Sequence, residues 1–202
     1  MSAFLPHTGR LHELLYPGAR LLLTKPIGVS HRSLRYDVLA VWHGNVKVVV
    51  DTRLPNRLVL KALEAHAISG VTSYTSVHPE IRLGDSRIDF ALTDTSGTTY
   101  LEVKSCALAR EHVALFPDAP STRSFHHAEV LKDLAQSGTR SVLLFVSTRP
   151  DVASFAPYED VDPSFARALA GAKESGVKIL AYASFLDRNR FYLGKPLRVD
   201  IG

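Results

Sequence analysis

The chain has 202 residues, 46% of them hydrophobic, so it can bury a full core as one large or two small domains. Its formal net charge of +4 permits a polyanionic partner without demanding one, because Lys and Arg form no concentrated run. The single cysteine, Cys106, excludes an internal disulfide. No segment approaches the roughly 20 apolar residues that cross a membrane, and no signal peptide pattern opens the chain, so we expect a cytoplasmic protein.

The first 50 residues predict a small β unit. Residues 19–24 and 36–51 have strand character, the latter folding as a hairpin about Trp42 to Asn45. A helix is expected next, over residues 57–68, with Asn56 as its N-cap. Because the pattern changes between the hairpin and this helix, we predict two domains, residues 1–53 and 54–202.

The rest of the chain predicts an α/β unit. Strands are expected first, at residues 73–82, 87–93 and 98–108 and in a short segment ending at Phe116. They are followed by a helix over 124–136, a strand over 141–147, a helix opening at Asp162-Pro163 and ending at Gly176, and a strand over 178–185. A fully apolar strand between two helices is typical of a parallel or mixed sheet that helices cover. The fold class expected is therefore α/β with a mixed sheet.

Two strands of this unit read as a β-hairpin around the turn formers Asp94 to Gly97. If the turn closes symmetrically, opposed residues have numbers that sum to about 191, which places Asp89 across from Glu102 at about 5 Å between Cβ atoms. Lys104 shares their face because side chains alternate along a strand. The same register predicts one apolar face, consisting of Ile88, Phe90, Leu101 and Val103.

Two directly opposed carboxylates repel each other, and a divalent cation resolves the conflict. Magnesium typically uses one or two carboxylates, keeps waters and leaves positions for phosphate oxygens. Lys104 could then hold the attacking water or stabilise charge on a phosphate. The alternative is a solvated hairpin face with a cross-strand ion pair between lysine and carboxylate.

The order of helix, hairpin, Glu-x-Lys strand, helix and buried strand from about Arg57 to Ala183 resembles the PD-(D/E)xK nuclease fold. The whole chain also resembles the sugar fermentation stimulation protein (SfsA) family, described as DNA-binding proteins with a nuclease-like domain. The matching stretches are Leu5 to Leu11, Pro17-Gly18, Leu54 to Arg57, Ser86 to Phe90, Glu102 to Ser105, Phe116 to Ala119, and Asp162-Pro163 with Phe165. The family implies an OB-type barrel at the N-terminus, a fold that can hold single-stranded nucleic acid. Family members begin with about two more strands, so this barrel is expected to lack its opening strands.

The resemblance implies a Mg²⁺ or Mn²⁺ site at Asp89, Glu102 and the Val103 carbonyl, with Lys104 as the catalytic lysine. Glu80 or Glu64 is the candidate for an additional acidic ligand. Contacts to nucleic acid are expected from five further residues: Arg123, His127, Arg87, Asn56 and Arg57. For Arg123 and His127 the alternative is a plain helix start, capped by Ser124, with solvated side chains.

The function expected from these features is that of a DNA-binding protein with a Mg²⁺-dependent phosphodiesterase site. The alternative is a non-catalytic DNA-binding regulator of sugar metabolism genes in which the nuclease fold is vestigial. A third possibility is action on RNA or on a nucleotide, because nothing in the sequence indicates the reading of base edges.

Overall fold

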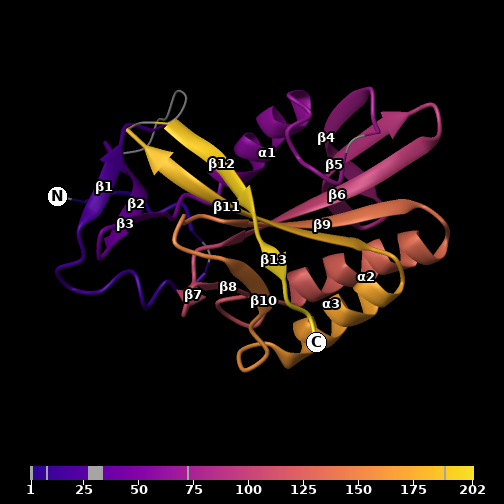
Figure 1. Cartoon of the computed structure of the whole chain (residues 1–202). Helices are drawn as coiled ribbons and strands as arrows, with labels where there is room; N and C mark the ends of the chain where they lie inside the picture. Colours follow the sequence, from indigo (N-terminus) through magenta and orange to yellow (C-terminus); the bar gives the residue numbers. More distant parts are fainter. Residues whose placement is uncertain (1, 8, 27–33, 72, 189) are drawn as a thin grey trace.

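The computed structural model describes residues 2–7, 9–26, 34–71, 73–188 and 190–202, so Thr8 of the first matching stretch lies outside the described part. An antiparallel sheet of three strands comes first, in the order β1 (Leu21–Thr24), β2 (Asp37–His43) and β3 (Val46–Val49). Helix α1 (Leu54–Glu64) leads from it into the larger unit (Figure 1). Within the described ranges, no helix is long and apolar enough to cross a membrane.

The larger unit is built on a six-stranded mixed sheet. Its strands lie in the order β12 (Arg190–Pro196), β11 (Lys178–Asp187), β9 (Arg140–Ser147), β6 (Gly97–Cys106), β5 (Ser86–Asp94) and β4 (Ser76–Leu83). Strand β9 runs parallel to both β6 and β11, and the other neighbours are antiparallel. The expected α/β class with a mixed sheet is confirmed.

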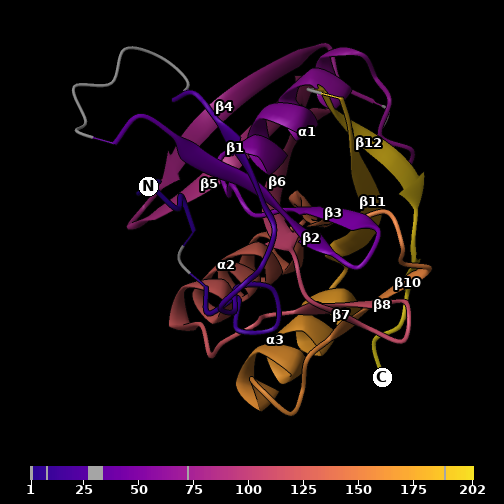
Figure 2. The same ribbon diagram turned by 90° about the vertical axis from the view of Figure 1, so that its left-hand side faces the viewer.

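Helices cover both faces of this sheet, as Figures 1 and 2 show. Helices α2 (Thr122–Gln136) and α3 (Pro163–Glu174) pack on one face around Leu131, Phe145 and Phe165. Helix α1 packs on the other face around Leu63, Leu101 and Leu144. A small second sheet, consisting of β13 (Arg198–Val199), β10 (Ser154–Pro157), β8 (Val113–Phe116) and β7 (Ala109–Arg110), extends the α2 and α3 side.

The N-terminal sheet is attached to the larger unit by apolar and polar contacts. Ala40 and Val49 pack against Leu186 of β11, and the Val49 N–H donates to the Thr148 carbonyl at 3.0 Å. Arg53, just before α1, donates to the carboxylates of Asp37 and Asp51, both at 2.6 Å. The guanidinium thereby connects the N-cap of α1 with β2 and with the segment that follows β3.

Two of the three predicted helix starts are wrong. Helix α1 begins at Leu54 with Arg53 as N-cap, not after Asn56, because Pro55 suits the first turn of a helix. Helix α2 begins after Ser121, whose Oγ accepts the Ser124 N–H at 3.1 Å, so Ser124 is not the cap. Helix α3 starts at Pro163 with Asp162 as cap, as predicted. Strand β12 was not predicted.

Candidate active site

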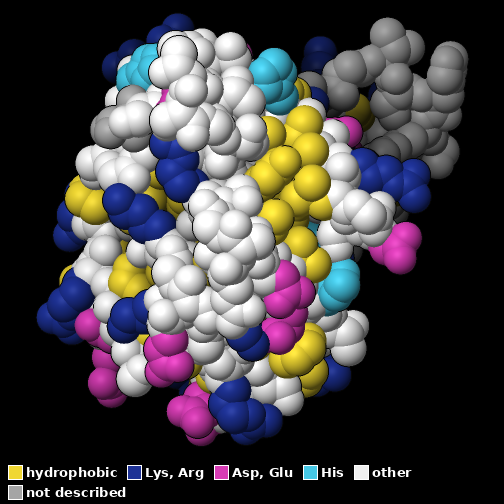
Figure 3. Space-filling model, turned by 90° about the vertical axis from the view of Figure 1, so that its right-hand side faces the viewer, with side chains coloured by type: hydrophobic (Ala, Val, Ile, Leu, Met, Phe, Trp, Pro, Cys, Tyr) yellow, Lys and Arg dark blue, Asp and Glu magenta, His cyan; other side chains and the backbone are white. Residues whose placement is uncertain are grey.

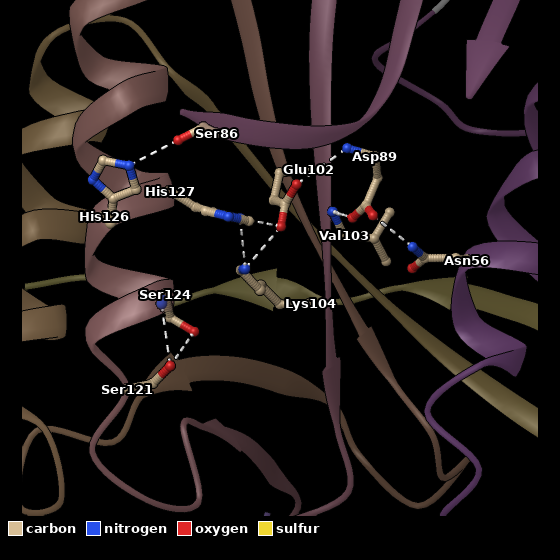
Figure 4. Close-up of polar contacts among 10 residues, drawn as sticks. All are labelled: Asn56, Ser86, Asp89, Glu102, Val103, Lys104, Ser121, Ser124, His126 and His127. Atoms are coloured by element: carbon tan, nitrogen blue, oxygen red, sulfur yellow. Dashed lines mark hydrogen bonds and ion pairs between the residues drawn. The ribbon is translucent and has the colours of Figure 1, made fainter. Parts of the chain in front are cut away.

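The β5–β6 hairpin has the predicted register. Its ladder pairs Phe90 with Leu101 and continues to Asp94 with Gly97, each pair summing to 191. One position beyond Phe90, side chains supply the cross-strand bonds. The Asp89 N–H donates to Glu102 Oε2 at 3.2 Å, and the Val103 N–H donates to Asp89 Oδ2 at 2.8 Å. The two carboxylates therefore lie beside each other at the end of the ladder (Figure 4).

The predicted single apolar face of this hairpin is wrong at Ile88. Ile88 packs in the α2 and α3 core, whereas Phe90, Leu101 and Val103 pack on the α1 side. Strand β4 pairs with β5 on both sides of this point, which leaves Glu80 opposite Asp89, and Glu80 has a positive φ of 55°. The left-handed residue of β4 thus lies opposite the point at which the side chains of β5 change from one face of the sheet to the other.

Glu102 is held by two cationic or hydrogen-bonding side chains. Only 2% of Glu102 and 8% of Lys104 are exposed, and Lys104 Nζ lies 2.8 Å from Glu102 Oε1. The same carboxylate oxygen is in close contact with His127 Nδ1 of α2, which also lies 3.1 Å from Lys104 Nζ. Burial raises the pKa of Glu102, but the His127 hydrogen bond and the Lys104 charge outweigh it and leave that pKa below its ordinary value.

Asp89 has the opposite electrostatic balance. Burial, followed by the charge of Glu102, raises its pKa to about 6, although three groups oppose the shift: the Val103 N–H, Lys104 and Asn56. The Asn56 Nδ2 donates to Asp89 Oδ1 at 2.6 Å. Asn56 was predicted to contact nucleic acid, but its amide is engaged by Asp89.

These groups meet at a cavity of about 410 Å³. Asp89, Glu102, Val103 and Lys104 form part of its wall, together with Asn56 of α1. The loop after β8 and the start of α2 contribute further residues, namely Pro117, Asp118, Ala119, Pro120, Ser121, Arg123 and Ser124. The N-terminal unit contributes His7 and Gly9. Both parts of the chain therefore enclose the site.

His7 and Asp118 are site residues that the sequence analysis did not single out. His7 Nε2 lies 3.8 Å from Asp118 Oδ2, and this neighbour lowers the pKa of Asp118 despite partial burial. Gly9 lies against the same carboxylate, which an added Cβ would overlap. Both residues belong to stretches that match the family, and that was the only signal in the sequence.

Other predicted site residues lie away from the cavity. Glu80 has a side chain that is 72% exposed and lies 3.8 Å from Arg87, which is also exposed. Glu64 and Arg57 are exposed on α1. None of these four lines the cavity, whereas Arg123, exposed at the start of α2, does.

The expected contact of His127 with nucleic acid does not fit the structure. The residue is only 4% exposed and its ring is directed to Glu102 and Lys104, because it lies on the face of α2 that packs on the sheet. His127 therefore lies at the predicted site as a partner of Glu102 and Lys104.

Within the described ranges, no group of three or more His, Cys, Asp or Glu side chains is arranged to hold a metal ion. The acidic groups that meet at the cavity wall beside Lys104 are the pair Asp89 and Glu102. Any cation bound there would take its remaining ligands from backbone carbonyls, water or a bound substrate.

Fold and site together define an α/β protein with a small N-terminal β unit and a buried carboxylate and lysine cluster at the edge of its central hairpin. The family model described as the sugar fermentation stimulation protein RE domain matches residues 53–190, and that described as the SfsA N-terminal OB domain matches residues 1–50. The chain therefore belongs to the sugar fermentation stimulation protein family.

Individual relatives agree with this assignment. The chain is 41% identical over 199 residues to a sugar fermentation stimulation protein homolog of Chloroflexus aurantiacus, covering 98% of this chain and 76% of the relative. It is 38% identical over 202 residues to a homolog from Moorella thermoacetica, covering 87% of that protein. A solved structure described as Pyrococcus furiosus SfsA in complex with Ca²⁺ superposes with a TM-score of 0.91 at 30% identity, covering 98% of this chain and 85% of the other.

Proposed function

We propose that this protein is a divalent-metal-dependent phosphodiesterase that acts on DNA through a PD-(D/E)xK-like site. The observation that carries the proposal is the placement of two buried, adjacent carboxylates, Asp89 and Glu102, beside Lys104 on the wall of one cavity. Buried like charges are costly unless a cation balances them. This arrangement therefore supports a ligand site better than a solvated hairpin face.

The residues present fit a divalent cation. Asp89 and Glu102 supply the one or two carboxylates that magnesium typically uses, and waters and phosphate oxygens complete its shell. Because the Val103 N–H is directed to Asp89, the carbonyl of the same strand residue faces β5 as well and is the third candidate ligand. The similar Pyrococcus furiosus protein is described in complex with Ca²⁺, which supports a divalent cation here. We propose Mg²⁺ or Mn²⁺ as the active ion.

A bound divalent cation would supply positive charge at the phosphate and lower the pKa of a bound water. Lys104 holds the attacking water or neutralises charge that develops on the phosphate oxygens. Asn56 and the Val103 N–H orient the Asp89 carboxylate, at 2.6 Å and 2.8 Å. Arg123, at the mouth of the cavity, contacts a neighbouring backbone phosphate.

The basic residues support such contacts without forming one broad surface. On the face shown in Figure 3, Lys and Arg side chains are interspersed with Asp and Glu. Affinity for nucleic acid on this proposal comes from the cavity and its mouth, where Arg123 lies, and from the N-terminal OB domain. Recognition of phosphate rather than of base edges follows, so we expect little sequence preference.

One observation favours a second candidate, a non-catalytic DNA-binding regulator. Glu102 already has Lys104 and His127 as partners. Among the residues that the structure describes, no third acidic side chain is grouped with the pair to hold a metal ion: Glu80 and Glu64 are exposed away from the cavity, and Asp118, on the cavity wall, is paired with His7. A protein that only binds DNA would keep such a cluster as a structural ion pair. The link of the relatives' name to sugar metabolism fits this candidate.

The test is incubation of the purified protein with single-stranded, duplex and branched DNA and with RNA, each with Mg²⁺, Mn²⁺ or EDTA. We expect the parent to cut DNA with either metal, and Asp89→Ala and Lys104→Ala to lose at least about 100-fold in rate. Glu80→Gln is the matched control, because its carboxylate lies outside the cavity, and it should cut at the parent's rate.

The outcomes separate the candidates. If no substrate is cut while DNA binding survives both alanine substitutions, the regulator replaces the nuclease. If the protein cuts RNA and leaves DNA intact, the substrate is RNA and the proposed site is retained. Loss of activity in Glu80→Gln equal to that in Asp89→Ala would place the reaction elsewhere than at this cavity.

A further inference from the structure

His127 lies behind the proposed catalytic groups and not beside the substrate. Its Nδ1 contacts Glu102 Oε1 and lies 3.1 Å from Lys104 Nζ, and the residue is 4% exposed. Within the described part of the chain, the cavity wall includes Glu102 and Lys104 but not His127. Figure 4 shows its ring reaching from α2 to these two side chains. Any effect of His127 on the reaction is therefore exerted through them.

The contact with Glu102 identifies where the ring carries its hydrogen. Glu102 is favoured in its ionised form, so a ring nitrogen in close contact with it is assigned the hydrogen. The 3.1 Å approach of the same Nδ1 to Lys104 Nζ is then a contact between two donors and not a hydrogen bond. Nδ1 thus donates to Glu102 Oε1, and this oxygen receives hydrogen bonds from His127 and from Lys104 at 2.8 Å. The other oxygen, Oε2, accepts the Asp89 N–H.

The Lys104 ammonium group has three N–H donors, which it would divide between Glu102 Oε1, at 2.8 Å, and a water or phosphate in the cavity. When its ammonium group turns to a water or phosphate in the cavity, Glu102 Oε1 loses one of its two donors. The remaining donor, His127, lies on a helix packed against the sheet and does not move with the lysine. A hydrogen-bond partner behind a ligating carboxylate orients it and maintains affinity for the ion.

From this geometry we infer that His127 is a positioning residue: it holds Glu102 in place while Lys104 is released to act in the cavity. The inference rests on the proposed function of the same site. It assigns to the histidine a role in orientation, in place of the contact with nucleic acid that the family resemblance implied.

The neighbouring His126 provides a matched control. It is exposed, and its Nε2 contacts Ser86 Oγ at 2.7 Å, not a carboxylate. Successive helix residues point about 100° apart, so the two imidazoles of this pair face different surroundings on one helix turn. Substitution of His126 changes the same kind of side chain at the adjacent position of α2 without touching Glu102.

The experiment compares His127→Leu, His127→Asn and His126→Leu with the parent. Ca²⁺ binding is measured by calorimetry without nucleic acid, and Mg²⁺-dependent cleavage is measured as kcat and KM. We expect His127→Leu to weaken Ca²⁺ binding by about 10- to 100-fold and to lower kcat with little change in KM. His127→Asn should recover most of both, because its amide N–H lies where Nδ1 lies. His126→Leu should match the parent.

Equal Ca²⁺ affinity and kcat in His127→Leu and the parent would overturn the inference, as would an effect confined to KM, which would indicate contact with the substrate. Unfolding midpoints show which variants fold. If His127→Leu does not, His127→Gln removes the donor from the Nδ1 position by extending the side chain one bond.

Failure of the proposed function is distinguishable. If the parent neither binds Ca²⁺ nor cuts, the metal-dependent reaction is wrong while the inference is judged by crystal structures of the parent and His127→Leu. A Glu102 carboxylate displaced in the variant supports positioning, and an unmoved carboxylate refutes it.

Discussion

Two aspartates of β5, at the two ends of its ladder with β6, are in opposite electrostatic states: Asp94 is in the last pair, beside the turn, and Asp89 lies just beyond Phe90. At the turn end, a hydrogen bond from Arg140 lowers the pKa of Asp94 to about 2. At the other end, burial and the charge of Glu102 raise the pKa of Asp89 to about 6. Five positions along one strand therefore separate a carboxylate stabilised in its charged form from one that is penalised for its charge.

The difference follows from which groups form the hydrogen bonds between β5 and β6 at each end of the ladder. From Phe90 to Asp94 the backbone ladder with β6 is regular, and Asp94 is paired at 3.0 Å with the guanidinium of Arg140, whose side chain is exposed. At Asp89 the ladder gives way to bonds through carboxylates, and the partner strand presents a second acid. A carboxylate whose charged form is disfavoured, next to a second acid, is typical of a ligand site.

The largest difference in stability is expected between variants of Lys104, the partner of Glu102, and variants of Arg140, the partner of Asp94. Lys104→Met should lower the free energy of unfolding by about 3–5 kcal/mol in EDTA, because it leaves buried Glu102 and Asp89 without their cation. Arg140→Met should lower the free energy of unfolding much less, because the Arg140 side chain is 41% exposed and solvent screens its charge. Equal losses in the two variants would show that burial does not separate the two ends.

The second-largest effect is expected in how the free energy of unfolding depends on pH. In EDTA, Asp89 binds a proton more tightly when folded, since its pKa rises from 3.8 to about 6. Its contribution to stability is thus present below about pH 4 and lost as the pH rises through about 6, roughly 3 kcal/mol in total at 1.36 kcal/mol per pH unit. Asp89→Asn should flatten this decline in urea unfolding measured from pH 4 to 8.

Asp94→Asn is the control for that series. The pKa of Asp94 is lowered, so its contribution is present above its ordinary value of 3.8 and lost as the pH falls through about 2. Between pH 5 and 8 this variant should keep the parent's slope. A free energy of unfolding that rises from pH 5 to 8 in the parent but not in Asp89→Asn would contradict the raised pKa of Asp89.

The smallest of these effects concerns the bond that orients Asp89. Asn56→Ala removes the donor 2.6 Å from Asp89 Oδ1 and should cost about 1 kcal/mol of unfolding free energy. Because this hydrogen bond favours the charged carboxylate, its loss should raise the pKa of Asp89 further, as measured by carboxyl NMR titration. An unchanged titration would mean that Asn56 does not hold the carboxylate in solution.

Much of the hairpin was predictable, because turn residues and alternation act over a few positions. The turn at Asp94 to Gly97 set the pairing of Phe90 with Leu101 and brought Asp89 beside Glu102. The same rule failed at Ile88, which packs on the other face of the sheet, since alternation assumes an unbroken strand. The left-handed backbone of Glu80 on the neighbouring strand has no signal in a glutamate.

Long-range partners explain the remaining misses. His127 was expected at the surface, although 25 positions separate it in sequence from the Glu102 that it contacts. Asn56 was expected to cap a helix and contact nucleic acid, but its amide bonds to a strand 33 positions away. His7 and Asp118 meet at the cavity from opposite sides of the domain boundary that we predicted. No local pattern encodes such pairs.

The order of helix and strand patterns along the sequence was enough to predict the α/β class and the mixed sheet. Patterns within a single turn or hairpin were enough to predict the capped start of α3 and two acids with a lysine on adjoining strands. Only packing of the helices and of the N-terminal segment onto the sheet decided which groups enclose the cavity, which oxygen of Glu102 is held from behind, and which acids remain in solvent. Those outcomes depend on burial and on contacts between distant segments, and they arise when the segments come together.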